Sequence, residues 1–390
     1  MRALLAAVAA AVILPLAASC AAADLEIKWG KPFDLGRGFY ARIHKLADGR
    51  LMAAYSLRGG IVARFYERGD KASGRNGRWT EPVDVAKGRS AENGTEKVWL
   101  STANAEFAQL ETGRIIYACN LRPAGNRASV HPYAIAIATS DDAGATWSPL
   151  KIVYRGRPSG DGVERGCYEP FVLPGKGNKA QIYYADETPY EEKRAKYQEI
   201  SVIETSDGGE TWSAPRAACY APRCRDGMPA VVEFDGWRLL SIETNPSGTL
   251  LHPQVIRNKI ADGWSKPVTL PSPDRFEPLA SPPNWRKTYG GAPYIAATEN
   301  YLLLSWQEYT GKGDLDVNKP VARVAAMPKS EASGGCITAM RGVSSPSSVC
   351  EGRDRMMWPS LCALGGDNFL LVAECDGRVK VFPGRVKAKP

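Results

Sequence analysis

Six segments of the chain share one pattern, in which an apolar run, a tight turn and a second apolar run follow one another. Turn signals such as Asp48-Gly49 and Asp235-Gly236 fall in the middle of the segments, as β-hairpins require. The segments begin at Ala41, Asn104, Glu169, Met228, Ala292 and Pro359, at intervals of 59 to 67 residues. Repetition of one hairpin at a steady interval is typical of a repeat architecture, in which neighbouring units complete one another's core.

A turn motif with the spacing Ser/Thr-x-Asp-x-Gly-x-Thr-Trp occurs twice between the hairpins, at 140–147 and 205–212. Its aspartate can accept backbone N–H groups, its glycine supplies a positive φ, and we expect its tryptophan to pack under the turn. A strand-like run precedes each copy. Each copy is therefore expected to close a hairpin.

A tryptophan followed closely by a proline is a third recurring element. It occurs at Trp79, Trp147, Trp212 and Trp264. We expect it to mark the outer edge of a four-stranded blade, because an edge strand tolerates proline. A further copy at Trp29 precedes the first hairpin. Its position predicts that it pairs beside the basic C-terminal segment 379–390 and so completes the last blade.

These patterns predict an all-β fold, a six-bladed β-propeller of four-stranded antiparallel blades that is closed by an N-terminal outer strand. We expect residues 24–390 to form this single domain. Two packed all-β domains are the alternative, and the even spacing and the closing strand argue against them.

The N-terminus has the features of a secretory signal peptide spanning residues 1–23. Arg2 is followed by an apolar run from Leu4 to Leu16 and then by small residues that permit cleavage after Ala23. The segment before Cys20 also permits lipidation of that cysteine, which would anchor the protein to the cell envelope. No other apolar run approaches the length of a membrane span. The sequence therefore predicts a secreted or periplasmic protein, without a membrane span.

Composition narrows the classes of ligand. Eight cysteines remain after Cys20, an even number that is compatible with disulfides, and the pair that is closest in sequence is Cys219 and Cys224. With three histidines and no CxxC motif, we expect neither a metal site nor another cofactor. The net charge of +8 favours an acidic glycan or an anionic surface. Nucleic acid is not expected, because no basic run is interleaved with aromatic residues. The protein is expected to act as a monomer.

Hairpin geometry predicts one rim of the propeller as the site. The start of each inner strand and the end of its partner emerge on that rim, and the tight turns lie on the other. The residues expected there are Arg42, Asn104, Arg122, Glu169, Asp186, Arg225, Asp226, Glu243, Tyr289 and Trp358. Carboxylates, guanidinium groups and aromatic rings gathered in this way suit a sugar.

Individual roles follow from residue type. Glu169 and Glu243 lie on adjacent blades, where two carboxylates can approach the roughly 5–5.5 Å that retaining glycosidases use. Arg42 is either a fixed cation at the pocket floor or one half of a buried ion pair. Among the remaining residues, the amide and guanidinium groups can position hydroxyls, and the aromatic rings either stack on the sugar or pack within loops.

The motifs resemble those of a known family. Asp-box turns on a six-fold hairpin repeat are similar to the sialidase superfamily, and "YARIHKL" resembles its arginine-bearing first strand. "YEPF" at 168–171 and "RDGMP" at 225–229 look closer to the family 93 exo-arabinanases. That resemblance implies an exo-acting retaining glycosidase with Glu169 as nucleophile and Glu243 as general acid/base. Glu233 is a competing match for the acid/base, but it lies beside a turn of the opposite rim.

Two rival functions remain open. An exo-sialidase would need a tyrosine nucleophile, but the sixth hairpin begins with Trp358-Pro359 where sialidases carry that tyrosine. His44 also stands where a proline is usual after the first arginine, and no arginine triad can be laid out. The second rival is a non-catalytic propeller that binds glycan or protein through the same rim. A pair of carboxylates within reach of one sugar would distinguish an enzyme from it.

Overall fold

The computed structural model describes residues 24–67, 77–87, 89–93, 96–123, 132–157, 164–190, 197–309, 320–346 and 355–389. The predicted signal peptide, including Cys20, lies outside these residues. In the described part of the chain, no helix is long and apolar enough to cross a membrane.

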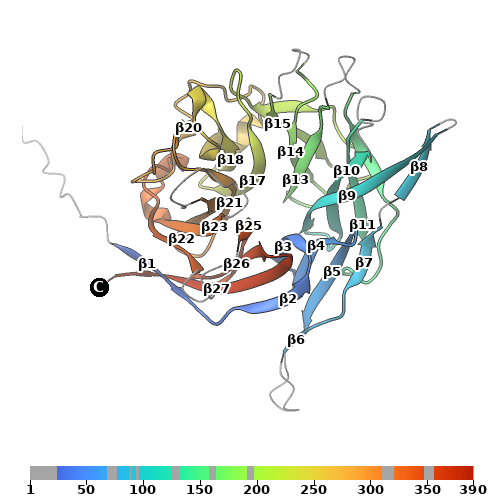
Figure 1. The fold of residues 1–390 in the computed structure, drawn as a ribbon, viewed down its shortest axis with the longest axis horizontal. Coiled ribbons are helices and arrows are strands. Elements are labelled where there is room, and N and C mark those ends of the chain that lie inside the picture. The colour runs from blue at the N-terminus through green and yellow to red at the C-terminus, as the bar shows by residue number, and fades with distance from the viewer. Residues whose placement is uncertain are drawn as a thin grey trace, which may run out of the picture.

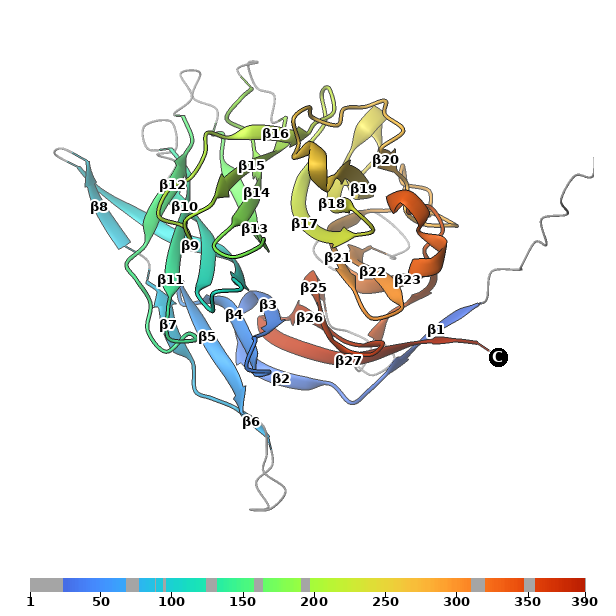
Figure 2. The same cartoon turned by 180° about the vertical axis from the view of Figure 1, so that it is seen from behind.

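Six antiparallel sheets are arranged around a common axis as the blades of a propeller (Figures 1 and 2). Blade 1 contains β3 (Phe39–Lys45), β4 (Leu51–Leu57), β5 (Gly60–Glu67), β6 (Arg78–Trp79) and β7 (Val83–Ala86). Blade 2 contains β8 (Arg89–Asn93), β9 (Glu96–Gln109), β10 (Ile115–Pro123), β11 (Ala134–Ser140) and β12 (Lys151–Arg155). Blade 3 contains β13 (Cys167–Pro174), β14 (Ala180–Asp186), β15 (Glu199–Thr205) and β16 (Arg216–Cys219).

The second half of the chain forms the other three blades. Blade 4 contains β17 (Gly227–Phe234), β18 (Trp237–Thr244), β19 (His252–Lys259) and β20 (Arg275–Phe276). Blade 5 contains β21 (Gly290–Ala297), β22 (Tyr301–Glu308), β23 (Val321–Pro328) and β24 (Arg341–Ser344). Blade 6 contains β25 (Met356–Gly365), β26 (Asn368–Cys375) and β27 (Arg378–Ala388), joined by β1 (Leu25–Trp29) and β2 (Phe33–Arg37). Short 3₁₀ turns lie at Pro246–Gly248, Ile260–Asp262, Lys329–Glu331 and Ser333–Gly335.

The N-terminal strand closes the ring, which confirms the prediction from Trp29. β1 pairs antiparallel with β27, from Leu25 opposite Ala388 to Trp29 opposite Gly384. Figure 1 shows the two strands side by side, one from each end of the chain. The indole Nε1 of Trp29 also donates a hydrogen bond of 2.9 Å to Ser344 in blade 5. The last blade is therefore tied to both chain ends and to its neighbour.

Each inner strand carries a two-residue bulge at its start. The bulges appear as register shifts in all six hairpins. Their first residues are Tyr40, Asn104, Glu169, Met228, Ala292 and Trp358, and all six have φ between 49° and 57°. We call these six residues the bulge ring. A left-handed conformation is uncommon for residues other than glycine, so its recurrence once per blade is a property of the architecture. The N–H groups of Met228, Ala292 and Trp358 donate to side chains of the preceding blade.

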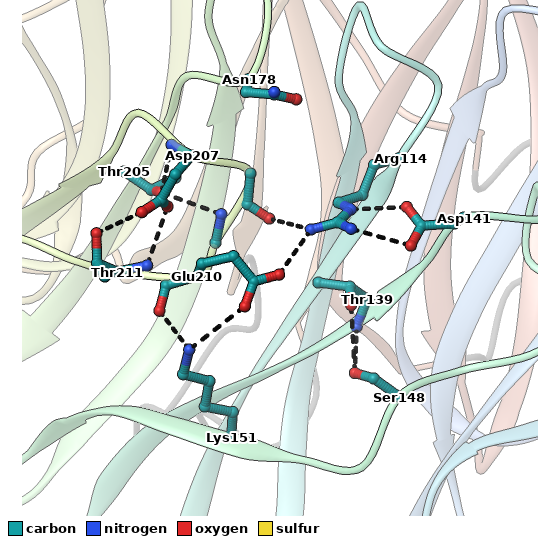
Figure 3. A network of polar contacts seen from close by, with 12 residues as sticks. Arg114, Thr139, Asp141, Ser148, Lys151, Asn178, Thr205, Asp207, Glu210 and Thr211 are labelled. Atoms are coloured by element: carbon teal, nitrogen blue, oxygen red, sulfur yellow. Dashed lines mark hydrogen bonds and ion pairs between the residues drawn. The ribbon is translucent and has the colours of Figure 1, made fainter.

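The two repeat turns adopt the same hydrogen-bonded structure. Asp142 accepts the Thr146 N–H and Asp207 accepts the Thr211 N–H, each at 2.9 Å. These bonds, together with those from the threonine hydroxyls, hold the pKa of each carboxyl below its usual value. Arg114 connects the two turns, since its guanidinium pairs with Asp141 at 2.7 Å and with Glu210 at 3.0 Å (Figure 3). The repeat turns therefore brace blade 2 against blade 3.

The tryptophans of the Trp-Pro element differ in position. Trp29 and Trp79 lie in outer strands. Trp147, Trp212 and Trp264 instead lie in the connections that precede the outer strands β12, β16 and β20. Trp264 is buried, and its Nε1 donates to the Tyr183 hydroxyl of blade 3 at 2.8 Å. These tryptophans therefore pack blades together as well as marking their outer edges.

Cys219 and Cys224, the pair that is closest in sequence, do not form a disulfide, and both thiols are free. Among the cysteines in the described ranges, the structure forms no disulfide bond. Six of them are buried in the packed interior of the blades, where burial raises the pKa of thiols such as Cys119 to about 12. These cysteines act as small apolar core residues.

Candidate active site

Glu169 belongs to the bulge ring and reaches into the next blade. Its Oε2 accepts the backbone N–H of Met228, another bulge residue, at 2.9 Å. Burial, and after it the charge of Glu243, raises the pKa of the Glu169 carboxyl to about 7, although the Met228 hydrogen bond and the charges of Arg122 and Arg225 oppose the rise. A half-buried carboxylate with a pKa near neutral is typical of a catalytic group.

Glu243 is held in the same way one blade further on. It stands near the end of β18, opposite Gly227, and its Oε2 accepts the N–H of Ala292 at 2.7 Å. Burial raises the pKa of the Glu243 carboxyl, while the Ala292 hydrogen bond and the charge of Arg225 oppose this rise. The left-handed bulges thus supply the N–H groups that orient both candidate catalytic glutamates.

The two glutamates meet at one dipeptide, Gly227-Met228. Glu169 binds the Met228 N–H, and Glu243 Oε1 lies 3.4 Å from where a Cβ would stand on Gly227. The absence of a side chain at Gly227 makes room for Gln198, whose Oε1 would lie 2.7 Å from a Cβ there. Standard covalent geometry of the dipeptide then limits the separation of the nearest carboxylate oxygens to about 9 Å at most. Both carboxylates can therefore reach one sugar ring.

Arg122 and Asn104 lie on the blade 2 side of Glu169. Arg122 Nη2 donates to Asn104 Oδ1 at 2.6 Å, and its guanidinium stacks 5.5 Å above the ring of Tyr168. Its charge lowers the pKa of Glu169, which places it close to that carboxylate. Both residues predicted for the site on this side therefore lie near Glu169.

The positive charge of Arg225 acts on both glutamates, since it lowers the pKa of each carboxyl. Its guanidinium pairs with Glu187 at 3.1 Å, and its side chain is 37% exposed. The backbone of Arg225 is fixed as well, because its N–H donates to Asn245 Oδ1 at 2.8 Å. Glu187 was not among the residues predicted from sequence, although it directly follows the strand end at Asp186.

Tyr289 and Trp358 lie on the blade 5 and blade 6 side. The Tyr289 hydroxyl accepts a 2.9 Å hydrogen bond from Gln307, whose Oε1 accepts the Trp358 N–H at 2.8 Å. A Cβ on Gly291 would lie 2.3 Å from the Tyr289 hydroxyl and 2.9 Å from Glu243 Oε2. Glycine is therefore required at this position for the phenol and the carboxylate to converge.

Trp358 packs as well as facing the site. It contacts the buried Tyr40, Met228 and Ala292 of the bulge ring. Phe39 lies 6.4 Å from the Trp358 ring and is 43% exposed. Four of the six bulge residues thus form an apolar floor, beside which the polar Glu169 and Asn104 stand.

Arg42 lies beneath this floor and is 3% exposed. Its guanidinium lies 4.0 Å from the centre of the Tyr40 ring and pairs with Glu106 at 3.4 Å. Glu106 also accepts a hydrogen bond from Tyr294 at 3.3 Å and contacts His44 Nε2 at 2.7 Å. The structure thus places Arg42 in a buried ion pair, one of the two roles predicted for it. Arg42 and Glu106 both stand two residues after a bulge residue, so they occupy the same repeat position in neighbouring blades.

Asp226 and Asp186 lie outside the site, contrary to the prediction. Asp226 is fully buried and bonds both its oxygens to Arg275, at 2.8 and 2.9 Å. Asp186 is also buried, and it accepts hydrogen bonds from Tyr154 and Thr188, each at 2.7 Å. A strand end fixes the rim on which a residue lies, but the direction of the side chain depends on the local pleat. Both aspartates point into the packed body of the blades.

A cavity of about 770 Å³ opens at the other end of the axis. Each blade contributes to its lining, which includes His44, Phe107, Phe171, Val231, Tyr294 and Leu361. Glu233 also lines this cavity, as expected of a residue beside a turn. It is therefore on the face opposite Glu169. Among the described residues, no cluster of three or more His, Cys, Asp or Glu side chains could hold a metal ion.

Comparisons with known proteins show where this fold occurs. No protein-family model and no curated protein sequence matches the chain. Among solved structures, a protein of unknown function from Dyadobacter fermentans has a TM-score of 0.62 at 13% identity, covering 93% of this chain and 99% of its own. The GH93 α-L-arabinofuranosidase of Fusarium graminearum, solved with arabinobiose, has a TM-score of 0.58 at 14% identity, covering 92% and 98%. A leech intramolecular trans-sialidase has a TM-score of 0.54 at 12% identity, covering 87% and 65%. The chain therefore has the sialidase-like propeller fold that was expected from its motifs.

Proposed function

We propose that the protein is an exported, exo-acting glycoside hydrolase that removes terminal sugars from an arabinan-like glycan by a retaining mechanism. The observation that carries this proposal is that Glu169 accepts the Met228 N–H while Glu243 lies opposite the preceding residue, Gly227, on the neighbouring strand. A binding module has no need to bring two half-buried carboxylates to one place, since their mutual repulsion is costly. Catalysis at a glycosidic bond requires such a pair.

The proposed reaction uses one proton shared by the pair. Glu169, as carboxylate, attacks the anomeric carbon while Glu243 gives its proton to the leaving oxygen, so that a glycosyl–Glu169 ester forms as the glycosidic bond breaks. Glu243 then takes a proton from water, which attacks the ester and releases the sugar and the Glu169 carboxylate. Burial raises the pKa of both carboxyls, so the pair retains a proton more readily than free glutamates do, and the reaction uses the form in which that proton is on Glu243.

The surrounding side chains suit a sugar ring. Arg122 and Asn104 present polar groups beside Glu169, and Arg225 favours the charged form of the nucleophile. Tyr289 can orient Glu243, and Trp358 offers an aromatic face on the opposite side. Arg42 supports the floor from below without reaching the sugar.

The choice of arabinose is supported by structural similarity to the Fusarium arabinofuranosidase. Export is supported by the signal peptide in the sequence, which would deliver the enzyme to the periplasm or the medium, with lipidation at Cys20 as the alternative anchor.

One observation favours exo-sialidase activity as a second candidate. Sialidase chemistry needs a tyrosine paired with a glutamate, and Tyr289 and Glu243 converge over Gly291. Under that alternative, replacement of Tyr289 by phenylalanine would abolish sialoside cleavage, whereas Glu169→Gln would leave it in place. A non-catalytic glycan-binding propeller is the third possibility, and it would bind sugar without turnover.

A panel of aryl glycosides and oligosaccharides tests the proposal. The panel contains α-arabinofuranosides, linear arabino-oligosaccharides and sialosides, assayed with the wild type, Glu169→Gln and Tyr289→Phe. The proposal predicts release from an arabinoside that disappears in Glu169→Gln. Sialoside cleavage that survives Glu169→Gln but not Tyr289→Phe would replace the proposal with the sialidase reading. Sugar binding without any turnover would leave the binding propeller.

A further inference from the structure

Glu187 is a buried carboxylate beside the site, and the proposed reaction leaves it without a role. It directly follows β14 in blade 3, and its side chain is 2% exposed. Its Oε1 pairs with Arg225 at 3.1 Å, and its Oε2 accepts the Gly166 N–H at 3.1 Å and the Tyr168 hydroxyl at 3.4 Å. Its own N–H donates to the Gly166 carbonyl at 2.9 Å. The carboxylate is therefore fixed from several directions.

Tyr168 connects Glu187 to a second cation. Its hydroxyl bonds to Glu187, and its ring carries the guanidinium of Arg122 at 5.5 Å. The ring folds closely over Gly166, where a Cβ would meet the Tyr168 hydroxyl at 2.2 Å. Glycine at this position thus permits Tyr168 to reach Glu187 and to support Arg122. The buried carboxylate of Glu187 therefore contacts Arg225 directly and also contacts Tyr168, the residue on which Arg122 rests.

We propose that Glu187 is a positioning residue that holds Arg225 directly, and Arg122 through Tyr168, against the pair of Glu169 and Glu243. This inference deepens the proposed function and rests on it for its catalytic meaning. An arginine side chain on a partly exposed surface loses conformational entropy when it is ordered, so a fixed buried partner is needed to keep its charge in one place.

Other charged and titratable groups also face these carboxylates. Those around Glu169 in the described part of the structure are Glu243, Tyr40, Tyr289, Arg122 and Arg225. Those around Glu187 are Arg225, Tyr168, Asp186 and Cys167. Burial raises the pKa of Asp186, Cys167 and Tyr168 above their usual values.

The direction in which the pKa of Glu169 changes in Glu187→Gln shows whether Glu187 holds Arg225 in place or acts only through its own negative charge. If Glu187→Gln frees Arg225 to move away, Glu169 loses a nearby positive charge and its pKa rises. If Arg225 stays in place without its partner, the loss of a negative charge makes the pKa of Glu169 fall. A positioning role also requires that Arg225→Met has the same effect, and that the double variant adds nothing to either single change.

The experiment measures the pKa of Glu169 by carbon-13 NMR of labelled glutamate carboxyls, with the resonance assigned from its loss in Glu169→Gln. We expect Glu187→Gln and Arg225→Met each to raise the pKa of Glu169 by ~1 unit, with no further rise in the double variant. The matched control is Glu331→Gln, which breaks the 2.7 Å ion pair with Arg341 on the outside of blade 5 and should leave the pKa of Glu169 unmoved.

A fall or no change in Glu187→Gln, or additive shifts in the double variant, would overturn the proposal. Should Glu187→Gln fail to fold, Arg225→Met can still contradict the proposal, because an unmoved pKa of Glu169 in that variant overturns it. The readout does not depend on turnover. A protein that shows the predicted shifts but hydrolyses no glycoside would keep the positioning role and lose the proposed function. In an active enzyme, the acidic limb of the pH–rate profile should shift to higher pH by the same amount as the pKa of Glu169.

Discussion

Glu243 and Gln307 occupy equivalent places in neighbouring blades, each accepting the N–H of the left-handed bulge residue in the following blade. The distances are 2.7 Å to Ala292 and 2.8 Å to Trp358. The propeller thus repeats one hydrogen bond around its axis. Blade 4 places a carboxylate where blade 5 places a neutral amide, so the architecture accepts either group, and the charge at Glu243 is not needed for the fold.

Replacing Glu243 by glutamine tests this separation of fold and chemistry. Because glutamine already serves in blade 5, the variant should keep its melting temperature. Loss of the general acid should lower kcat/KM by about 10²–10⁴-fold for oligosaccharides, and by much less for dinitrophenyl glycosides, whose leaving group needs no proton. Steady-state kinetics on both substrate types measures the difference. An equal loss on both would contradict the assignment of Glu243 as the acid.

The pH dependence of stability tests the environment of Glu169. Its pKa is raised from 4.5 to about 7 in the folded protein. The folded state therefore favours the protonated carboxyl, a contribution that is fully present below pH 4.5 and is lost as the pH rises through 7. Glu169→Gln removes this dependence. The free energy of unfolding of the variant, relative to that of the wild type, should therefore increase on the order of 1–3 kcal/mol when the pH is raised from acidic to mildly alkaline. Urea unfolding at both pH values gives the comparison. A constant difference would show that Glu169 has an ordinary pKa.

The pair of Asp226 and Arg275 should govern stability and not catalysis. Both side chains are almost fully buried, so Asp226→Asn leaves an unpaired guanidinium in the core. We expect a loss of about 3–5 kcal/mol in the free energy of unfolding, measured by urea denaturation. The kinetic constants of the folded fraction should remain those of the wild type. A selective change in KM with unaltered stability would return Asp226 to the substrate site.

Gly291 should tolerate no side chain. An added Cβ would lie 2.3 Å from the Tyr289 hydroxyl and 2.9 Å from Glu243, so Gly291→Ala must displace one or both. We expect a fall in kcat of roughly 10²-fold, as misplacement of a catalytic group by about 1 Å produces. Gly30→Ala is the control, because the nearest atom there is Pro383 Cβ at 3.3 Å, in the closing strands. Similar activity in both variants would argue against the role given to Tyr289 and Glu243.

The fold could be predicted from the sequence because it is periodic. The hairpin starts found in the sequence fall within one residue of the six bulges, and the copy of the edge motif at Trp29 identified the closing strand. Strand ends also identified the rim that holds Glu169 and Glu243. Those predictions needed only the period of the pattern and the antiparallel pairing.

The contacts of individual side chains could not be predicted in the same way. A strand end does not say whether a side chain such as Asp226 faces the axis or a neighbouring blade. Glu187 and Glu106 lie one blade away from their partners Arg225 and Arg42 and meet them only in the folded ring, so no spacing within one hairpin reveals them. The even number of cysteines suggested disulfides, but an even count does not place two sulfurs within bonding distance.

The most direct test of the two-glutamate mechanism is methanolysis of an aryl α-L-arabinofuranoside, with the configuration of the product measured by proton NMR. The methyl glycoside does not mutarotate, so its configuration records the pathway. The proposed double displacement predicts methyl α-L-arabinofuranoside from the wild type and none from Glu169→Gln. A product of inverted configuration, or undiminished turnover in Glu169→Gln, would contradict a covalent intermediate on Glu169.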